Sequence, residues 1–540
     1  MKFAICQINS QIGDFENNSN KIINYIKLAT EQKCDLIIFP ELCISGYPPM
    51  DLLDNPEFID HNYNALNKIL KHTVNSDNYV ILGSITRLNN QLFNSALVLH
   101  KGNIIFQQNK TLLPNYDVFD EKRYFTPNKK FSLFQINNFK IGILICEDIW
   151  YDEFKNYKIN PINKIKKLKP DLVVVISASP FEKEKIEKRL TICHNNFVKS
   201  KIPIIYVNSI GAQDELIFDG ASFYLNNDNI FICKQFEEDF AIFDLNQKIN
   251  NYKKVPLIEQ IHSALILGIK DYFLKCKFNK TIIGISGGID SAVVASLAVR
   301  ALGNNNVIGL ILPSKYTSQA SIDDAIKLSR NLEIEYFIIS INKLFSLYLD
   351  ELSEYFKNRE FDITEENIQS RIRGNLLMAF ANKFNALVLA TGNKSELSMG
   401  YCTLYGDLIG GLAVIGDLLK REIYELARYI NKEKEIIPEN IFLKAPSAEL
   451  KYNQKDEDTL PPYKILDAVL YYHFELGLTK NDIINKYNFD ENIVNEIFHK
   501  LYRQEYKRKQ APITLKISRK NFGIGRRIPI TNKFYFLNKK

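Results

Sequence analysis

Hydrophobic positions in the first 245 residues fall into short runs that polar turns separate. The runs are rich in Val, Ile, Phe and Tyr, which is typical of buried β-strands. The predicted strands cover residues 3–8, 35–41, 79–85, 94–100, 139–147, 171–177, 202–208, 218–225 and 241–245. Helical patterns lie between some of them, at 18–32 and 182–199. This interleaving predicts an α/β domain with several buried strands.

The pattern becomes more regular after residue 258, where apolar runs alternate with helical periodicity. Strands are predicted at 280–286, 306–313, 335–341 and 385–392, and helices between them at 321–332 and 369–384. Strand and helix repeated in this way predict a doubly wound parallel sheet. The polar stretch 246–257 contains neither kind of run. We therefore predict two domains, at 1–245 and 258–540, with a linker at 246–257.

Composition narrows the class of protein. A chain of 540 residues is too long for one core, and its 46% hydrophobic content suffices to build two. The net charge of +7 permits anionic substrates without requiring nucleic acid. The eight cysteines form no C-x-x-C pair, and no apolar run approaches the roughly 20 residues that span a bilayer. With no signal-peptide pattern at the N-terminus, we expect a cytoplasmic enzyme without a membrane partner.

The stretch GISGGIDS, at 284–291, lies between the first strand and the first helix of the second domain. Glycines can adopt positive φ and let backbone N–H groups approach an anion, and a helix N-terminus adds partial positive charge. The loop therefore predicts a phosphate cradle, although it lacks the lysine of a Walker loop. An alternative is a tight turn in which Asp290 or Ser291 caps the helix. The loop residues are Gly284, Ile285, Ser286, Gly287, Gly288, Ile289, Asp290 and Ser291.

The motif SGGIDS resembles the signature of the PP-loop ATP pyrophosphatases, which have an adenine nucleotide α-hydrolase-like fold. The segments ENIQSRIRGNLLMAFAN, LATGNKSELSMGYCTLYGD, PSAELKYNQKDEDTLPPY and EYKRKQAP narrow the resemblance to the NAD synthetases. That family adenylates the carboxylate of deamido-NAD with ATP and Mg²⁺, and ammonia then displaces AMP. The resemblance implies that the loop, Thr391 and Lys420 bind ATP. It also implies that Asn367, Glu396, Asp407 and Lys507 bind deamido-NAD, and that Asp290 and Glu396 hold Mg²⁺.

Three segments of the first domain, FPELCISGYPP, NKTLLPNYDVFDEKRYF and IGILICEDIW, place Glu41, Lys110 and Cys146 near strand ends. They resemble the Glu-Lys-Cys triad of the nitrilase superfamily, which implies an α-β-β-α sandwich. In that family the cysteine attacks an amide carbonyl and the glutamate acts as general base. The lysine stabilises the oxyanion and helps to keep Cys146 as a thiolate. Glu121 matches a second, supporting glutamate.

The chain resembles a family in which the amidase domain is fused to an ammonia-consuming synthetase. This resemblance implies that the amide hydrolysed is that of glutamine. Residues Tyr116, Ser179 and Lys185 fall where the fused family contacts it. Some relatives carry arginine at the last position, so Lys183 and Arg189 stay open as alternatives to Lys185. We expect the other cysteines of this domain, such as Cys6, Cys43 and Cys193, to be core residues.

The leading interpretation is a homo-oligomeric, glutamine-dependent NAD synthetase that binds deamido-NAD, ATP and L-glutamine but no nucleic acid. One alternative is a PP-loop amidotransferase for a nucleobase or a tRNA, which the basic segment 507–527 favours. Others are a binding protein without catalysis and an amidase with an inert second domain. The triad and the SGGIDS aspartate are both present, which argues against these two.

Overall fold

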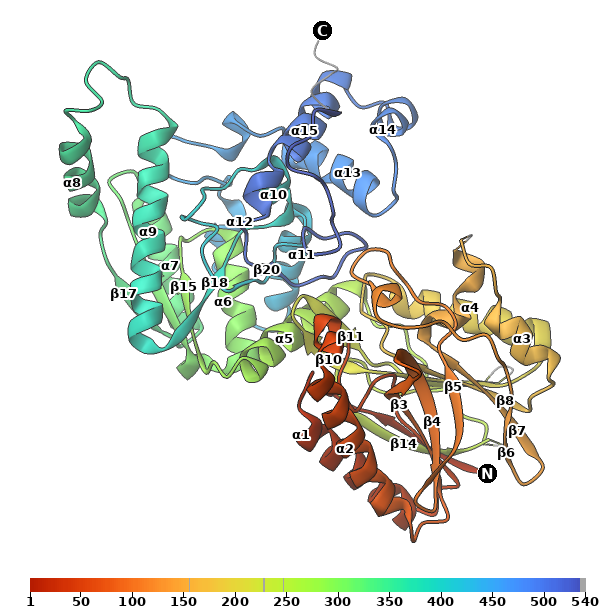
Figure 1. The fold of residues 1–540 in the computed structure, drawn as a ribbon. Coiled ribbons are helices and arrows are strands. Elements are labelled where there is room, and N and C mark those ends of the chain that lie inside the picture. Colours follow the sequence, from red (N-terminus) through yellow and green to blue (C-terminus); the bar gives the residue numbers. More distant parts are fainter. Residues whose placement is uncertain (155, 227–228, 246, 535–540) are drawn as a thin grey trace. The chain divides into compact units, whose positions relative to one another are not determined.

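The computed structural model describes all residues except 155, 227–228, 246 and 535–540. The chain divides into two compact units, Met1–Val255 and Pro256–Lys540, and each is an α/β unit (Figure 1). The predicted linker begins at residue 246, which lies outside the described residues. The side chain of Asn251 exchanges two hydrogen bonds, of 2.7 and 2.9 Å, with the backbone of Ile232, so this part of the segment is held against the first unit.

The first unit contains two six-stranded sheets. One has the order β14-β1-β2-β3-β4-β5, and its strands are β14 (Asp239–Asp244), β1 (Lys2–Gln7), β2 (Leu36–Ile38), β3 (Tyr79–Leu88), β4 (Gln91–His100) and β5 (Asn103–Asn109). The other has the order β13-β12-β9-β8-β7-β6, and its strands are β13 (Asn229–Ile232), β12 (Phe223–Asn226), β9 (Ile204–Asn208), β8 (Leu172–Ser177), β7 (Phe139–Ile145) and β6 (Phe134–Ile136). A hairpin of β10 (Ile210–Gln213) and β11 (Leu216–Asp219) completes the unit.

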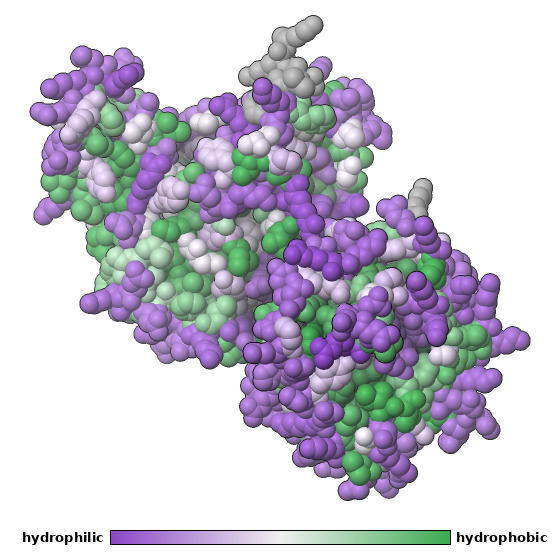
Figure 2. Space-filling view, in the orientation of Figure 1, coloured by the Kyte–Doolittle hydropathy of each residue, from purple (hydrophilic) through white to green (hydrophobic). Residues whose placement is uncertain are grey.

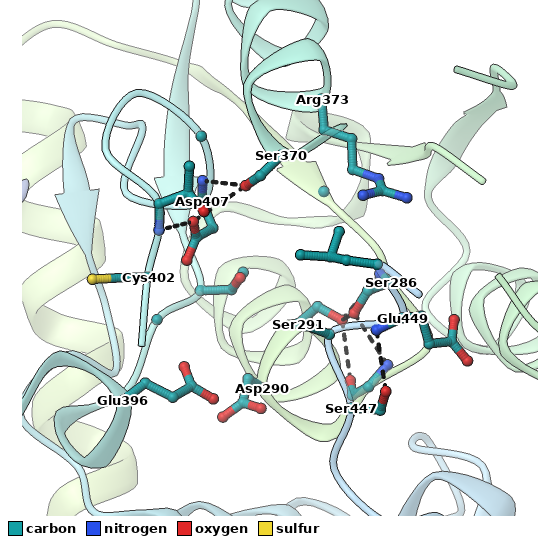
Figure 3. Close-up of a pocket in the computed structure, with 18 of the residues that line it drawn as sticks. Ser286, Asp290, Ser291, Ser370, Arg373, Glu396, Cys402, Asp407, Ser447 and Glu449 are labelled. Atoms are coloured by element: carbon teal, nitrogen blue, oxygen red, sulfur yellow. Dashed lines mark hydrogen bonds between the residues drawn. The ribbon is translucent and has the colours of Figure 1, made fainter. Parts of the chain in front are cut away.

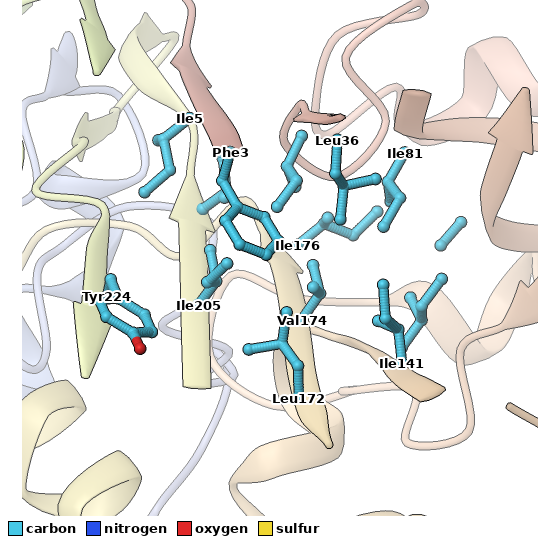
Figure 4. Packing of buried hydrophobic residues seen from close by; sticks show 14 of the residues in the cluster. Phe3, Ile5, Leu36, Ile81, Ile141, Leu172, Val174, Ile176, Ile205 and Tyr224 are labelled. Atoms are coloured by element: carbon cyan, nitrogen blue, oxygen red, sulfur yellow. The ribbon is translucent and has the colours of Figure 1, made fainter. Parts of the chain in front are cut away.

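Alternation along the strands explains how these sheets pack. Phe3 and Ile5 of β1 join Val174 and Ile176 of β8 in one core between the sheets (Figure 4). The intervening Ala4 and Cys6 face the opposite way, into a core shared with helices. The helices of that second core are α1 (Phe15–Glu31) and α2 (Pro56–Thr73), and those on the other sheet are α3 (Pro161–Lys167) and α4 (Lys185–Ser200). The predicted α-β-β-α sandwich is confirmed, and Cys6, Cys43 and Cys193 are core residues.

The second unit is built on a parallel sheet of order β17-β16-β15-β18-β19-β20. Its strands are β15 (Lys280–Gly284), β16 (Val307–Ile311), β17 (Glu335–Ile338), β18 (Ala386–Ala390), β19 (Leu412–Ala413) and β20 (Ile513–Thr514). The chain runs from β15 outward to β17 and then returns to β18 on the other side of β15. In a doubly wound sheet this reversal opens a crevice beyond the carboxyl ends of β15 and β18, where ligands bind.

Helices complete the second unit, and the two that the periodicity predicted, at 321–332 and 369–384, are among them. Those of the sheet region are α5 (Leu257–Lys275), α6 (Ile289–Leu302), α7 (Gln319–Asn331), α8 (Asn342–Leu352), α9 (Ile363–Phe384), α10 (Lys394–Met399), α11 (Lys420–Ile430) and α12 (Glu439–Leu443). The C-terminal helices are α13 (Tyr463–Phe474), α14 (Lys480–Tyr487), α15 (Glu491–Arg503) and α16 (Glu505–Arg508), and α13 to α15 share a core of their own.

Hydrophilic side chains cover most of the face shown in Figure 2, and hydrophobic ones form separate patches on both units. Within the part of the chain that the structure describes, no helix combines the length and the apolar character that crossing a membrane requires.

Candidate active sites in the two units

The three predicted catalytic residues of the first unit follow the ends of three strands. Glu41 comes after β2, Lys110 directly after β5 and Cys146 directly after β7. All three are buried, with exposed fractions of 1, 1 and 8%. Gly83 of β3 makes room for the Glu41 loop, because a Cβ there would lie 2.2 Å from the backbone nitrogen of Leu42.

Lys110 and two carboxylates form a closed ionic cluster. Its Nζ donates to Glu41 Oε1 and Glu121 Oε1, both at 2.7 Å. Glu41 also accepts from Asn94 Nδ2 at 2.7 Å and from the backbone N–H of Ala178 at 2.8 Å. Burial alone would lower the pKa of Lys110, but Glu121 and Glu41 raise it well above its ordinary value, so the ammonium stays charged. Burial raises the pKa of Glu121 to about 7.

The Cys146 thiol corrects one expectation from the sequence. Burial raises its pKa well above the usual value, and the nearby Glu41 adds to this, while Lys110 opposes it without prevailing. Lys110 therefore does not keep Cys146 as a thiolate in the resting protein, because its charge is already shared with two carboxylates. A thiol that is protonated at rest requires Glu41 to accept its proton as the bond to the substrate forms.

This protonation state can be measured directly. The difference in thiolate absorbance near 240 nm between the wild type and Cys146→Ala should show no transition at or below neutral pH. The physical reason is that burial stabilises the neutral thiol, so the thiolate fraction at pH 7 is smaller than for an exposed cysteine. A transition centred below pH 7 would contradict this result.

The predicted glutamine residues lie around the same site. Tyr116 donates to both carboxylate oxygens of Glu147, at 3.0 and 3.1 Å, and Tyr157 donates to the same carboxylate at 3.0 Å. Glu147, which directly follows Cys146, was not assigned from the sequence, although its place next to the nucleophile was a signal. The backbone N–H of Ser179 donates to Asn208 Oδ1 at 2.8 Å, which fixes the Ser179 turn after β8.

The cations near this site differ in their availability. Lys185 is half-buried, pairs with Glu182 at 2.8 Å and lies 4.8 Å from the ring centroid of Trp150. Arg189 is fully buried and forms an ion pair with Asp219, itself fully buried. Both cations pair with a carboxylate, but the Arg189 pair is fully buried and the Lys185 pair is partly exposed, so Lys185 is the better candidate of these two for an anionic ligand.

The second unit contains a cavity of about 410 Å³ at the carboxyl ends of β15, β16 and β18 (Figure 3). Every synthetase residue predicted from the sequence lines it. These residues are the loop Gly284 to Ser291, Thr391, Lys420, Asn367, Glu396, Asp407 and Lys507. Segments far apart in the chain thus converge where the sheet order reverses.

The glycine-rich loop has the geometry of an anion cradle. Gly287 has φ +76°, and a Cβ there would lie 2.2 Å from the carbonyl oxygen of Ser321. Helix α6 begins at Ile289, with Gly288 as its N-cap. The alternative in which Asp290 or Ser291 caps the helix is therefore wrong. Ser291 Oγ instead accepts from the backbone N–H of Ser286 at 3.3 Å and donates to the carbonyl of Gly288 at 3.0 Å.

Lys420 lies buried between the two predicted metal ligands. Its Nζ contacts Asp290 Oδ2 at 2.5 Å and Glu396 Oε1 at 3.4 Å. Burial raises the pKa of Glu396 to about 8, and burial opposes the charge on Lys420, but Asp290 and Glu396 raise the pKa of the lysine. The lysine is thus held by carboxylates, and it would have to turn to reach a phosphate.

Carboxylates of this cavity are candidate ligands for Mg²⁺. Among the described residues no group of three or more His, Cys, Asp or Glu side chains is arranged to hold a metal ion. Asp290 and Glu396 nevertheless offer hard oxygen donors on one side of the cavity (Figure 3), and Asp456 Oδ1 is buried there without a hydrogen-bond partner. Because Mg²⁺ commonly takes one or two carboxylates and completes its shell with phosphates and water, these residues fit it.

The predicted deamido-NAD residues surround the loop 400–407. Thr403 links two of them: its Oγ donates to Asn367 Oδ1 at 2.7 Å, and its N–H to Asp407 Oδ1 at 2.5 Å. Lys507 Nζ donates to the carbonyls of Gly400 and Cys402, at 2.8 and 2.7 Å. The side chains therefore shape this loop as well as line the cavity.

Other functional candidates in the cavity were missed from the sequence. Arg373 of α9 donates through Nε to the carbonyl of Leu312 at 2.9 Å, and burial lowers its pKa to about 10. Lys444 donates to the carbonyl of Gly287 at 2.9 Å and pairs with Asp324 at 2.7 Å. Arg373 lay inside a segment that carried the family resemblance, but nothing in its spacing distinguished it from a surface arginine.

Comparisons with known proteins match a family to each part of the chain. The carbon-nitrogen hydrolase family model matches residues 2–254, and the NAD synthase model matches residues 261–511. The glutamine-dependent NAD(+) synthetases of Synechocystis sp. and Thermotoga maritima are 42 and 41% identical to this chain, and the alignments cover 98 and 99% of it and 99% of each relative.

Solved structures extend the likeness. A glutamine-dependent NAD⁺ synthetase from Acinetobacter baumannii, in complex with ADP, is 38% identical with a TM-score of 0.78, covering 98% of each chain. One from Cytophaga hutchinsonii has a TM-score of 0.86 at 19% identity, covers 99% of this chain and 98% of its own, and so shows the shared fold. This chain belongs to the family of glutamine-dependent NAD(+) synthetases.

Proposed function

We propose that this chain forms NAD by ATP-dependent amidation of deamido-NAD, with glutamine as the nitrogen donor and with AMP, diphosphate and glutamate as the other products. The single observation that carries the proposal is the match of the whole chain, at 42% identity, to a synthetase of this kind. This argues for NAD synthesis over the nucleobase or tRNA amidotransferase that the basic segment had left open.

In the first unit, Cys146 attacks the side-chain amide of glutamine. Glu41 accepts the thiol proton and later delivers it to the departing ammonia, while the Lys110 ammonium stabilises the oxyanion. Glu121 supports the reaction by holding Lys110 from the opposite side at 2.7 Å. Water then hydrolyses the thioester, with Glu41 as the base again.

In the second unit, the N–H groups of the loop Gly284 to Ser291 and the N-terminus of α6 hold the diphosphate that ATP releases. Asp290 and Glu396 would hold Mg²⁺, which supplies positive charge to the phosphates. Lys420 moves from these carboxylates toward a phosphate when ATP enters. Asn367, Asp407 and Lys507 orient deamido-NAD so that its carboxylate faces the α-phosphate, and ammonia displaces AMP from the adenylate.

Glutamine recognition follows from the charges around Cys146. Glu147, held by Tyr116 and Tyr157, would bind the α-ammonium, and Lys185 the α-carboxylate. We expect Lys185→Met to raise the KM for glutamine by about 10-fold or more, the equivalent of about 1.4 kcal/mol, and to leave ammonia-supported synthesis unchanged.

The matched control is Lys188→Met. Lys188 also lies over Trp150, 5.6 Å from its centroid, but its side chain is more exposed and pairs with Glu153. Its KM for glutamine should stay within about twofold of the wild type. An equal rise of the KM for glutamine in both variants would show that the effect comes from general surface charge.

The function itself is tested by incubating the full chain with ATP, Mg²⁺, glutamine and deamido-NAD. We expect NAD, AMP, diphosphate and glutamate in equal amounts. Formation of ADP and orthophosphate would exclude an adenylated intermediate and with it the proposed role of the loop at Gly287.

Two broader proposals accompany this function. All eight cysteines are free thiols, which supports a reducing compartment such as the cytoplasm. The second proposal is a homo-oligomer, whose contacts would cover exposed hydrophobic side chains such as Leu347, Tyr355 and Phe361, which are 59, 79 and 68% exposed. Sedimentation velocity measures the latter, and a single species of 62.5 kDa would contradict it.

A further inference from the structure

The carboxylate of Asp148 is buried two residues after Cys146, and the proposed reaction gives it no role. Its exposed fraction is 1%. Oδ1 accepts hydrogen bonds from the backbone N–H groups of Thr111 and Leu112, at 2.9 and 2.8 Å. Oδ2 accepts from the backbone N–H of Ile145 at 3.2 Å. One buried carboxylate therefore accepts hydrogen bonds from three backbone N–H groups.

These three donors belong to the two segments that carry catalytic groups. Thr111 and Leu112 directly follow Lys110 at the end of β5, in one sheet, and Ile145 directly precedes Cys146 at the end of β7, in the other. The Asp148 carboxylate is thus a direct link between the lysine segment and the cysteine turn.

The cysteine turn needs such support. Cys146 has φ +42°, in the left-handed region that a side chain other than glycine enters only at an energetic cost. Neighbouring residues must therefore stabilise this backbone conformation. The hydrogen bond from the Ile145 N–H to Asp148 Oδ2 does so within the turn itself. Lys110 is fixed independently at its other end, because its ammonium lies between Glu41 and Glu121.

Three N–H donors favour the ionised form of Asp148, since a protonated carboxyl group would offer one acceptor less. Burial raises the pKa of Asp148 to about 7, and the N–H groups of Leu112, Ile145 and Thr111, together with Lys110, oppose this rise. The contacts that connect the two segments therefore favour the ionised form against the effect of burial.

We infer that Asp148 is a positioning residue for glutamine hydrolysis: its carboxylate sets the separation of Cys146 and Lys110 by holding the backbone beside each. The inference rests on the proposed glutaminase reaction. The oxyanion that forms on the glutamine carbonyl must lie within bonding distance of Cys146 and within hydrogen-bond reach of Lys110 at the same time. A change of about 1 Å in such a separation can cost about 100-fold in rate.

The test is Asp148→Asn in the full chain. The amide has the same shape but only one acceptor oxygen, so either Ile145 or the pair Thr111 and Leu112 faces an NH₂ group instead. We expect the kcat with glutamine to fall by about 100-fold, with the KM for glutamine within about threefold, because Tyr116 and Lys185 are untouched. Ammonia-supported NAD formation should be unchanged.

Counting reactive Cys146 side chains distinguishes a positioning defect from a loss of folded protein. Cys146 is alkylated with iodoacetamide and its peptide quantified by mass spectrometry, and kcat is expressed per reactive Cys146. The matched control is Thr73→Val, which also removes a buried oxygen that accepts a backbone N–H, from Gly102 at 3.1 Å, but at the end of α2. This control should lose thermal stability and keep its kcat per site.

A kcat per site within threefold of the wild type in Asp148→Asn would overturn the inference. A wild-type chain that forms NAD from ammonia but not from glutamine would instead overturn the proposed glutaminase function. If the variant does not fold, hydrogen exchange of the wild type decides. The amides of Thr111 and Leu112 lie outside any strand, and we expect them to exchange as slowly as those of β7. Rapid exchange there would show that Asp148 does not hold this segment.

Discussion

Cys146→Ala is expected to abolish NAD formation from glutamine while NAD formation from ammonium chloride continues. The alanine has no nucleophile, and Glu41 and Lys110 cannot replace one, so the loss with glutamine should be about 10⁴-fold or more. The ammonia-supported rate depends on the cavity of the second unit, whose described lining residues lie between Gly284 and Lys507, and should stay within about twofold. The measurement is NAD formed per minute with each nitrogen donor at saturating ATP and deamido-NAD.

The control for this variant is Cys193→Ala. Cys193 is also buried in the first unit, but in the core between α4 and its sheet. Its replacement should lower stability by about 1–2 kcal/mol and leave both activities in place. Equal losses with glutamine and ammonia in Cys146→Ala would contradict the division of labour between the two units.

Gly287→Ala should abolish NAD formation from both nitrogen donors. A Cβ at this position meets the Ser321 carbonyl oxygen at 2.2 Å, and φ +76° adds strain, so the loop between β15 and α6 must shift. Its N–H groups would then no longer point at the diphosphate, and we expect kcat/KM for ATP to fall by about 100-fold or more. Ammonia-supported turnover at varied ATP measures this, and alkylation of Cys146 should proceed at the wild-type rate.

The chain offers a matched control at the other end of the same helix. Gly303 follows α6 with φ +84°, and a Cβ there would meet no atom within 4 Å. Gly303→Ala thus also introduces backbone strain, of about 1–3 kcal/mol at φ +84° and ψ 149°, without a clash. Its kcat/KM for ATP should be that of the wild type. If both variants lost the same activity, strain in α6 would explain the result and the cradle would not.

Local patterns predicted most of the architecture because each pattern reports burial of its own segment. In β1, Phe3 and Ile5 face one core and Ala4 and Cys6 the other, so alternation showed a strand buried on both sides. Helix α2 was not predicted, although Asn55 caps it by accepting from the N–H of Glu57 and Pro56 begins it. The short strands β19 and β20 have two residues each and leave no periodic signal.

A candidate site could be predicted from the sequence where its backbone geometry requires particular residue types in a short motif. The loop SGGIDS needs glycine at 287 because of the Ser321 carbonyl, so the requirement is written in the sequence. Lys420 was different. It was expected to reach a phosphate, yet in the structure it lies between Asp290 and Glu396, since a buried ammonium needs carboxylates.

The two fold classes, the predicted triad of Glu41, Lys110 and Cys146 and the predicted phosphate loop could be read from the chain alone, because strand and helix patterns and the motifs that carry the resemblance all lie within short segments. Three features came from the folded structure: burial raises the pKa of the Cys146 thiol, Arg189 pairs with Asp219, and Asp148 joins the Lys110 segment to the cysteine turn. Each of these depends on burial or on contacts between distant segments, and neither quantity is local in the chain.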